Sequence, residues 1–334
     1  MLLLVLAAII TIILGVGVGS VYVRPLDTVA IFFNRLLGTT LPETINSVYP
    51  ALIMDIRLPR VLLAFLTGAS LSVCGTVMQS VLQNPLASPY GLGISAGSGF
   101  GAALVIVCGA SAGALGLILL PTVSFGFGLL TMLSVMAVAS RIDRNMSNST
   151  IVLTGMVISL FFSAIMNLLS TLSPTYAQRI NLWQLGSFSA RDWSSVWVLL
   201  PVSAVCLLFF LGYSREMDIM TFGEEQAQAM GVNLRKCKWI LMGAVAVLTG
   251  TAVAFTGIIG FVDLIAPHMV RQYFGSSHRR VLPASALFGG TFLVLCDLAA
   301  RTVAPPREIP VGSITALIGA PFFIYIFFHG RKKC

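Results

Sequence analysis

Few residues in this 334-residue sequence are placed for covalent chemistry. The run GISAG at 93–97 matches the GxSxG pattern of serine hydrolases, which requires a strand-to-helix turn and separate Asp and His partners. Ser95 instead lies early in an apolar segment that we expect to form a membrane helix. His268, His278 and His329 are far apart in the sequence, and no HExxH motif is present. The residue types and their spacing therefore favour no catalytic site.

The glycine-rich run at 91–104 (GLGISAGSGFGAAL) resembles a nucleotide-binding loop only in its composition. Gly93, Gly97 and Gly101 are four residues apart and share one helix face, a spacing that favours close packing between membrane helices. No Gly-Lys-Ser/Thr sequence occurs, so the chain lacks a P-loop for the phosphates of ATP. Any ATP-driven motor, with its ATP and Mg²⁺, must therefore be a separate chain.

The cysteines also indicate no cofactor. None of the six forms a CxxC pair or a cluster with histidine. Most lie in apolar segments, where a free thiol packs as a small apolar side chain. We expect no disulfide framework, no metal and no cofactor on this chain.

The composition indicates which class of protein must position these residues. Apolar residues make up 57% of the chain and charged residues 10%, with a mean hydropathy of +0.94, whereas soluble domains carry about 25% charged residues. At roughly 20 residues per span, the chain accommodates about ten membrane helices. We predict an all-α, polytopic membrane protein in which residues 1–334 form one transmembrane domain. The expected spans are 2–22, 61–81, 92–110, 115–139, 150–171, 195–212, 239–256, 259–274, 282–300 and 312–329.

Basic residues are distributed unequally between the two sides of this predicted bundle. All four lysines and eight arginines, twelve of the twenty basic residues, lie on one side. The positive-inside rule places that side, with the polar segment 213–238 and the C-terminus, in the cytoplasm. The net charge of +8 therefore reflects orientation in the lipid bilayer rather than nucleic-acid binding. Residues 2–22 have no basic n-region, so we expect a retained first helix rather than a cleaved signal peptide.

The polar segment 213–238 (YSREMDIMTFGEEQAQAMGVNLRKCK) interrupts the otherwise apolar chain. Thr221 and Glu224 have the spacing of a capping box, and Gly231 suits the end of a short helix. Such a helix at the membrane surface would offer a docking point for a soluble partner. The alternative is an ordinary solvated loop with scattered charges.

Short motifs between residues 50 and 325 resemble the FecCD family of ABC-importer permeases, which take up iron–siderophore complexes, haem and cobalamin. In chain order they are RLPR (57–60), GASL (68–71), Gln79, NPLA (84–87), GLGISAG (91–97), WQLGS (183–187), GEE and MGV in the polar segment, GIIGFV (257–262), PHMVR (267–271), EIPVG (308–312) and TALIGAP (315–321). The resemblance implies ten transmembrane helices per subunit, two permease subunits around a central pathway, and both termini in the cytoplasm. It also implies two ATPase subunits and an extracytoplasmic substrate-binding protein as partners.

The resemblance further implies two sets of contact residues. ATPase coupling would involve the helix of the polar segment, with Thr221, Gly223, Glu224, Glu225, Ala227 and Gly231. Acidic residues suit its first turn because they complement the helix dipole. Docking of the binding protein would involve Arg57, Arg60 and Arg301, since guanidinium groups pair bidentately with carboxylates. The alternative for each arginine is interfacial anchoring at a helix end.

The translocation pathway is less evident in the sequence. Asn148 and Ser149 match positions that narrow the pathway in related permeases, although polar residues at a helix start also act as caps. Asp263 departs from the family pattern, in which a small residue is typical, and a carboxylate within a span is a candidate functional residue. It could pair with an arginine, line the pathway or lie at the outer membrane interface, and we favour the interface.

We therefore expect the membrane-spanning subunit of a type II ABC importer in the bacterial plasma (inner) membrane, with a ferric siderophore as cargo. Haem and cobalamin are alternative cargoes within the same class. An ion-driven secondary transporter is the alternative class, and it predicts intramembrane charged pairs and internal repeats. The sequence leaves open whether the second permease subunit is another copy of this chain or a sister permease.

Overall fold

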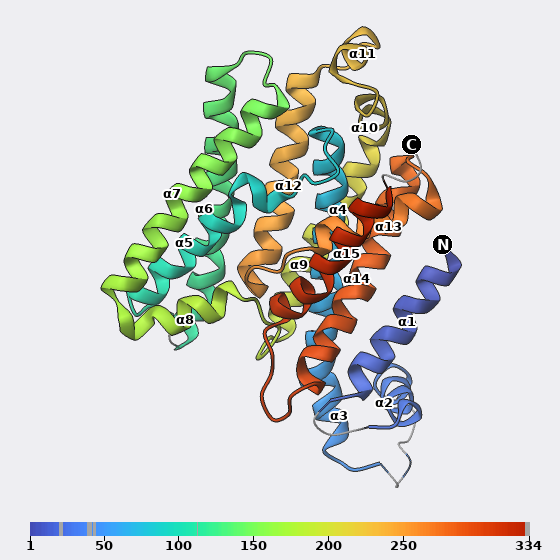
Figure 1. The fold of residues 1–334 in the computed structure, drawn as a ribbon. Helices are drawn as coiled ribbons and strands as arrows, with labels where there is room; N and C mark the ends of the chain where they lie inside the picture. Colours follow the sequence, from blue (N-terminus) through green and yellow to red (C-terminus); the bar gives the residue numbers. More distant parts are fainter. Residues whose placement is uncertain (20–22, 39–41, 43–44, 112, 331–334) are drawn as a thin grey trace.

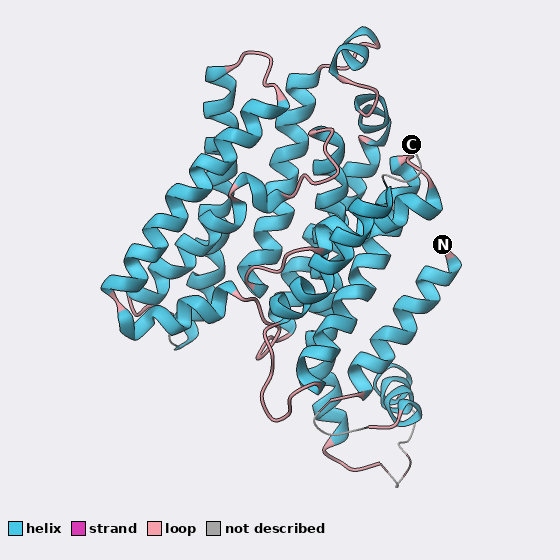
Figure 2. Cartoon of the chain, viewed as in Figure 1, coloured by secondary structure: helices cyan, strands magenta, loops and turns pink. Residues whose placement is uncertain are grey.

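Helices joined by loops form a bundle, and no strand occurs in the part of the chain that the structure describes (Figure 2). The structure is a computed structural model, and it describes residues 1–19, 23–38, 42, 45–111 and 113–330. A helix occurs at each expected span, although residues 20–22 of the first span lie outside the described ranges. These helices are α1 (Leu2–Gly17), α4 (Leu58–Val81), α5 (Ile94–Val107), α6 (Gly113–Ile142), α7 (Asn148–Leu172), α9 (Trp193–Gly212), α12 (Leu234–Thr256), α13 (Val262–Phe274), α14 (His278–Thr302) and α15 (Val311–Gly330).

The helices differ in how readily they could cross a membrane. Within the described ranges, six helical segments are long and apolar enough to span a bilayer, and they correspond to α4 with the residues before it, most of α6, and α7, α9, α12 and α14. Three more, in α1, α5 and α15, are apolar but shorter than 18 residues. α13 has 13 residues and contains Asp263, His268 and Arg271. The sequence therefore predicts the positions of the helices better than their lengths.

α4 lies at the centre of the molecule (Figure 1). It packs against α9, α12, α13 and α14, and 19 of its 24 residues are buried. Its contact with α14 is close because Gly68 faces Gly289, and a Cβ atom on Gly68 would meet the Gly289 carbonyl group. Absence of a side chain at this crossing allows the two backbones to approach.

The helices α5, α6 and α7 form a second group, with α8 (Pro174–Gln184) across one end of it (Figure 1). A Cβ atom on Gly97 would meet Thr131, and one on Gly101 would lie 2.8 Å from the Val123 carbonyl oxygen, both in α6. The predicted close packing through these two glycines is therefore confirmed. Gly93 instead precedes α5 with φ +87°, a conformation that glycine adopts without strain.

Several short helices cover the two ends of the bundle, and the sequence predicts one of them, in the polar segment 213–238. α10 (Ser214–Met220) and α11 (Glu224–Ala229) lie at one end, called here the α11 end. α2 (Pro25–Leu37) and α3 (Tyr49–Ala51) lie at the other, the α2 end, where a π-helical stretch (Leu52–Arg57) leads into α4. A 3₁₀ turn (Pro89–Leu92) precedes α5. α1 begins and α15 ends toward the α11 end (Figure 1).

Three of the family-like motifs meet inside the bundle. The backbone N–H of Ser187, in WQLGS, donates to the carbonyl of Thr256 at 2.8 Å, just before GIIGFV. The N–H of Gly312, in EIPVG, donates to the carbonyl of Leu185 at 3.1 Å. The Tyr90 hydroxyl donates to the carbonyl of Ile259 at 3.0 Å. Segments more than 50 residues apart thus satisfy each other's backbone groups where membrane helices are interrupted.

Candidate functional site

The polar segment 213–238 forms two short helices beyond the end of the bundle (Figure 1). The predicted capping box is wrong: Thr221 Oγ1 donates to the carbonyl of Asp218 at 2.6 Å at the end of α10. α11 begins at Glu224, after Gly223 with φ +118°. Gly231, with φ +88°, ends the turn as expected and donates its N–H to the Gln228 carbonyl at 2.9 Å. The positive φ of Gly223 favours glycine there, whereas space does not, because a Cβ atom at this position would meet no neighbouring atom.

α11 presents most of its side chains to the exterior. Ala227 is its buried residue, whereas Glu225 and Gln226 are exposed. Two large apolar side chains flank the helix, with Phe222 64% and Met230 60% exposed. Large exposed apolar side chains surrounded by polar residues are consistent with a contact surface for another protein.

Glu224 differs from Glu225 because it makes an ion pair inside the molecule. Its Oε1 lies 2.8 Å from Nζ of Lys238, whose side chain has no exposed area. The same Nζ donates to the carbonyl of Met146 at 2.7 Å, in the turn between α6 and α7. The sequence prediction places Lys238 with the charged loop residues, and nothing in its local sequence indicates burial.

A second set of polar contacts joins α10 to the bundle. Nδ1 of His278, at the start of α14, lies 2.5 Å from a carboxylate oxygen of Asp218 in α10. Nε2 of the same ring lies 2.5 Å from the Ser80 hydroxyl in α4. Arg271 in α13 donates to Ser80 at 3.1 Å and to Gln79 at 3.2 Å. Gln79 is thus a member of a structural network.

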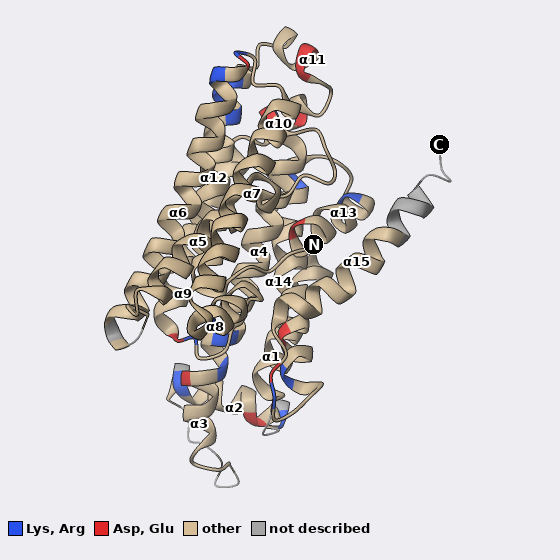
Figure 3. Ribbon diagram, turned by 60° about the vertical axis from the view of Figure 1, so that its left-hand side comes forward, with Lys and Arg blue, Asp and Glu red and all other residues tan. Residues whose placement is uncertain are grey.

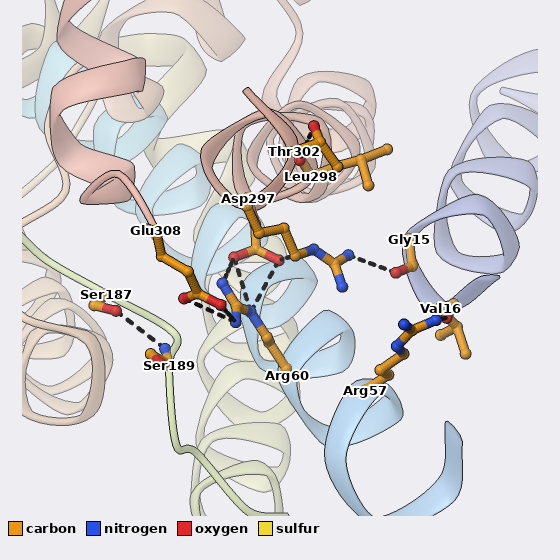
Figure 4. A network of polar contacts seen from close by, with 11 residues as sticks. Gly15, Val16, Arg57, Arg60, Ser187, Ser189, Asp297, Leu298, Thr302 and Glu308 are labelled. Carbon is orange, nitrogen blue, oxygen red and sulfur yellow. Dashed lines mark hydrogen bonds and ion pairs between the residues drawn. The ribbon is translucent and has the colours of Figure 1, made fainter. Parts of the chain in front are cut away.

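Two arginines of the predicted docking set, Arg57 and Arg60, lie close together where the π-helical stretch leads into α4 (Figure 4), and the third, Arg301, contacts the same carboxylate as Arg60. Arg57 is 5% exposed and donates to the carbonyls of Val16 and Gly17 at 3.1 and 3.0 Å, where α1 ends. Arg301 is 8% exposed and donates to the Gly15 carbonyl at 2.5 Å. Cationic groups at the last carbonyls of a helix are favourable for the helix dipole. Arg57 and Arg301 therefore hold the end of α1 against α4 and α14, and their predicted part in docking stays a prediction.

Arg60 and Arg301 share one buried carboxylate, Asp297 in α14 (Figure 4). Nη2 of Arg60 lies 2.8 Å from Asp297 Oδ1, and Nε of Arg301 lies 3.4 Å from Oδ2. Nη1 of Arg60 also contacts Glu308 at 2.9 Å. The sequence prediction does not include Asp297, although a carboxylate within an apolar span is a detectable signal.

Glu308 lies on the connection between α14 and α15, with 42% of its side chain exposed. Partial burial raises the pKa of its carboxyl group, but the hydrogen bonds and the positive charge of Arg60, together with smaller effects of Ser189 and Arg301, outweigh burial and hold the pKa below its usual value. The carboxylate therefore stays charged and accepts hydrogen bonds from Nη1 of Arg60.

Asn148 and Ser149 begin α7 at the α11 end, close to Met146. The cap position is Ser147, and neither of the two residues bonds to a free backbone N–H at the start of α7 in the described structure. Asn148 Oδ1 is buried without a hydrogen-bond partner in the part of the chain described, whereas Ser149 is exposed. The capping alternative is therefore not supported, and the role in the pathway stays a prediction.

Asp263 lies inside the protein, with 1% of its area exposed. Its Oδ2 accepts a hydrogen bond from the Ser88 hydroxyl, and Oδ1 has no partner among the described residues. The favoured expectation of a position at the outer interface is wrong, because α4 covers the residue: a Cβ atom on Gly75 would meet the Asp263 carbonyl group. Its partner is a serine rather than an arginine.

A bundle of apolar helices with an ordered helical extension at one end is the architecture of a polytopic membrane protein. Residues 6–329 match the FecCD transport family, and the chain belongs to that family. It is an ABC transporter permease, a multi-pass membrane protein that functions within an ABC complex.

Relatives cover nearly the whole chain. The uncharacterized ABC transporter permease protein YvrB of Bacillus subtilis (strain 168) is 39% identical over 97% of this chain and 91% of that protein. The Fe(3+)-citrate import system permease protein YfmE of the same organism is 34% identical over 99% and 96%. A solved inward-facing conformation of a transporter assigned to the metal-chelate ABC type has a TM-score of 0.84, with 30% identity and 98% of both chains covered.

Proposed function

We propose that this permease carries a ferric siderophore complex across the bacterial plasma membrane. An extracytoplasmic binding protein delivers the complex, and two separate ATPase subunits supply the energy from ATP and Mg²⁺. A second permease subunit, either another copy of this chain or a sister permease, completes the pathway. The exposed helix α11 is the observation that supports this proposal, because an ATPase needs a stiff element to push.

The coupling surface would consist of α11 and its flanking residues. Glu225 and Gln226 on the helix are exposed, and Phe222 and Met230 beside it add apolar area. Thr221 and Gly231 lie at the two turns that frame α11. The first-turn carboxylates suit the positive end of the helix dipole, and the glycine at 223 allows the sharp change of chain direction before it.

Docking of the binding protein would use the opposite, α2 end. The cluster Arg57, Arg60, Arg301, Asp297 and Glu308 contains three cationic and two acidic side chains, so its formal charge is positive by one. A positive cluster attracts acidic groups of a partner. Since Arg57 and Arg301 are buried, we assign them to shaping the surface and Arg60 to the direct contact.

The cargo assignment rests on the relatives. YfmE is named for Fe(3+)-citrate and aligns with nearly the whole chain. Other relatives are named for hemin and for cobalamin, so these cargoes remain the alternatives. Asn148 and Ser149 at the start of α7 and Asp263 inside the bundle are the proposed pathway residues.

The alternative class, an ion-driven secondary transporter, predicts charged pairs within the membrane. Arg60, Arg301 and Lys238 do form ion pairs, but each lies within five residues of an end of its helix. These positions fit structural roles at the membrane surfaces. No observation therefore favours the alternative class over an ABC importer.

The test is reconstitution of the permease, the ATPase subunits and the binding protein in lipid vesicles. We expect ATP-dependent accumulation of a ferric siderophore, and no accumulation when the ATPase is omitted or carries an inactive nucleotide site. Ferric citrate, haem and cobalamin, measured in parallel, distinguish the cargoes. Accumulation by the permease alone would overturn the proposal, whereas ATP-driven uptake of haem or cobalamin only would replace the cargo assignment.

A further inference from the structure

Lys238 is a buried cation with two partners from separate parts of the chain. It lies in the second turn of α12, with no exposed side-chain area. Its Nζ bonds to Glu224 Oε1 at 2.8 Å and to the Met146 carbonyl at 2.7 Å. Burial of an ammonium group is costly unless it is paired and hydrogen-bonded. The buried ammonium group therefore needs both contacts, and we expect them to persist while the surrounding helices stay packed.

The turn that supplies the Met146 carbonyl is itself rigid. The Asp143 carboxylate accepts hydrogen bonds from the N–H groups of Asn145 at 2.9 Å and Ser147 at 2.8 Å. Hydrogen bonding from the Ser147 side chain, together with these two N–H groups, lowers the pKa of Asp143, and the charge of Lys238 adds a smaller effect. Met146 has φ +54° and a fully buried side chain. Because α7 begins two residues later, a displacement of this turn displaces the first residues of α7.

The other partner belongs to α11. This helix has six residues and buries only Ala227 among them. Glu224 lies in its first turn and reaches Lys238, while the adjacent Glu225 is exposed. The link Glu224–Lys238–Met146 thus connects a small exposed helix to the start of a 25-residue membrane helix. Two groups bound to one buried ammonium move together as long as both bonds hold.

We propose that Lys238 is a positioning residue that couples α11 to the turn 143–147, so that displacement of α11 by an ATPase moves the start of α7. The proposal rests on the proposed function, since it needs a motor that acts on α11. It assigns to Lys238 a role in transmission, in which the residue contacts neither ATP nor cargo.

The matched variants are Lys238→Met and Lys236→Met. Methionine preserves most of the length and apolar stem of lysine but cannot form either polar bond. Lys236 is two residues away on the same helix and is exposed, so its replacement changes the net charge equally. Lys238→Arg restores the charge, although a planar guanidinium group replaces the compact ammonium.

Uptake and ATP hydrolysis are measured together in vesicles that contain the complete complex. We expect Lys238→Met to lower the amount of cargo taken up per ATP hydrolysed by about tenfold, with the ATPase still bound. Lys236→Met should leave the ratio unchanged, and Lys238→Arg should restore part of it. An unchanged ratio in Lys238→Met would overturn the proposal.

A second readout follows the start of α7 directly. A cysteine at Ser149, in a chain with Cys108 and Cys334 replaced by serine, reports ATP-dependent labelling by a water-soluble maleimide. We expect ATP to change the labelling rate in the parent complex but not in Lys238→Met. If Lys238→Met does not fold, Glu224→Ala breaks the same link from its partly exposed end and should also abolish the change. Persistence of the ATP-dependent change in a folded variant contradicts the link.

Failure of this inference is distinguishable from failure of the proposed function. If the parent complex shows no ATP-dependent uptake, the proposed function is wrong. If the parent complex transports and both Lys238→Met and Glu224→Ala keep the parent's ratio of uptake to hydrolysis, only the role of Lys238 is wrong. Loss of ATPase binding in Lys238→Met would also overturn the role, because Lys238 would then act in docking rather than in transmission.

Discussion

A buried charge must find its partners within the protein, and Asp297 illustrates the consequence for single residues. Its side chain has no exposed area, and it accepts contacts from both Arg60 and Arg301. Removal of the carboxylate would leave Arg301 with the Gly15 carbonyl and Arg60 with the partly exposed Glu308. Asp297 therefore stabilises the α2 end, although its side chain forms no part of the exposed surface.

We expect Asp297→Ala to lower the free energy of unfolding by about 3–5 kcal/mol, the usual cost of removing one partner from a buried ion network. The measurement is denaturant unfolding of the purified permease in mixed micelles. Asp55→Ala is the control, because Asp55 is exposed at the same end of the molecule. Equal unfolding midpoints for the two variants would show that the network contributes little.

Close approach of backbones determines how the helices assemble. At the α4–α14 crossing, Gly68 lies against Gly289, and a side chain on either glycine would meet the opposite helix. Gly243 in α12 differs, because a Cβ atom there would meet no neighbouring atom. Glycine therefore allows a close helix contact at position 68 but not at position 243, and only the packing distinguishes the two positions.

Alanine substitution at these two positions should have effects of opposite sign. Gly68→Ala should destabilise the permease by about 1–3 kcal/mol, because the added methyl group forces the helices apart. Gly243→Ala should be neutral or stabilising by up to about 1 kcal/mol, because alanine favours a helix over glycine. Thermal unfolding in detergent measures both. A loss of stability in Gly243→Ala as large as that in Gly68→Ala would contradict the packing argument.

At the scale of the whole molecule, charged residues gather toward the two ends of the helices, as Figure 3 shows. The α11 end carries Lys236, Lys238 and several arginines, and α1 begins and α15 ends toward it. From the positive-inside rule we predict that the α11 end lies in the cytoplasm and the α2 end outside the cell. This orientation is required if an ATPase is to reach α11.

Cysteine labelling in intact cells tests the orientation. In a chain with Cys108 and Cys334 replaced by serine, we introduce a cysteine at Gln226 in α11 or at Arg307 at the α2 end, both exposed positions. A membrane-impermeant maleimide should label position 307 in intact cells and position 226 only after the cells are opened. Labelling of position 226 from outside would reverse the orientation and exclude the proposed coupling.

The sequence predicts the fold well and the partners of individual residues poorly. Long apolar segments predict the helices, and Gly97 and Gly101 predict a close helix contact, since both signals are local. The capping box fails because Thr221 belongs to the end of α10, which the sequence does not distinguish from a loop. The interface position of Asp263 fails because burial depends on α4, which is remote in sequence.

The sequence by itself determined the class, the order of the helices and the polar segment at the membrane surface. Apolar content and segment length suffice for these, because a lipid bilayer acts on each segment separately. Only the tertiary structure decided which charges meet: Lys238 with a carbonyl 92 residues away, and Arg60 with a carboxylate 237 residues away. The physical reason is that the partner of a buried ion depends on which helices become neighbours, and periodicity along one helix does not specify its neighbours.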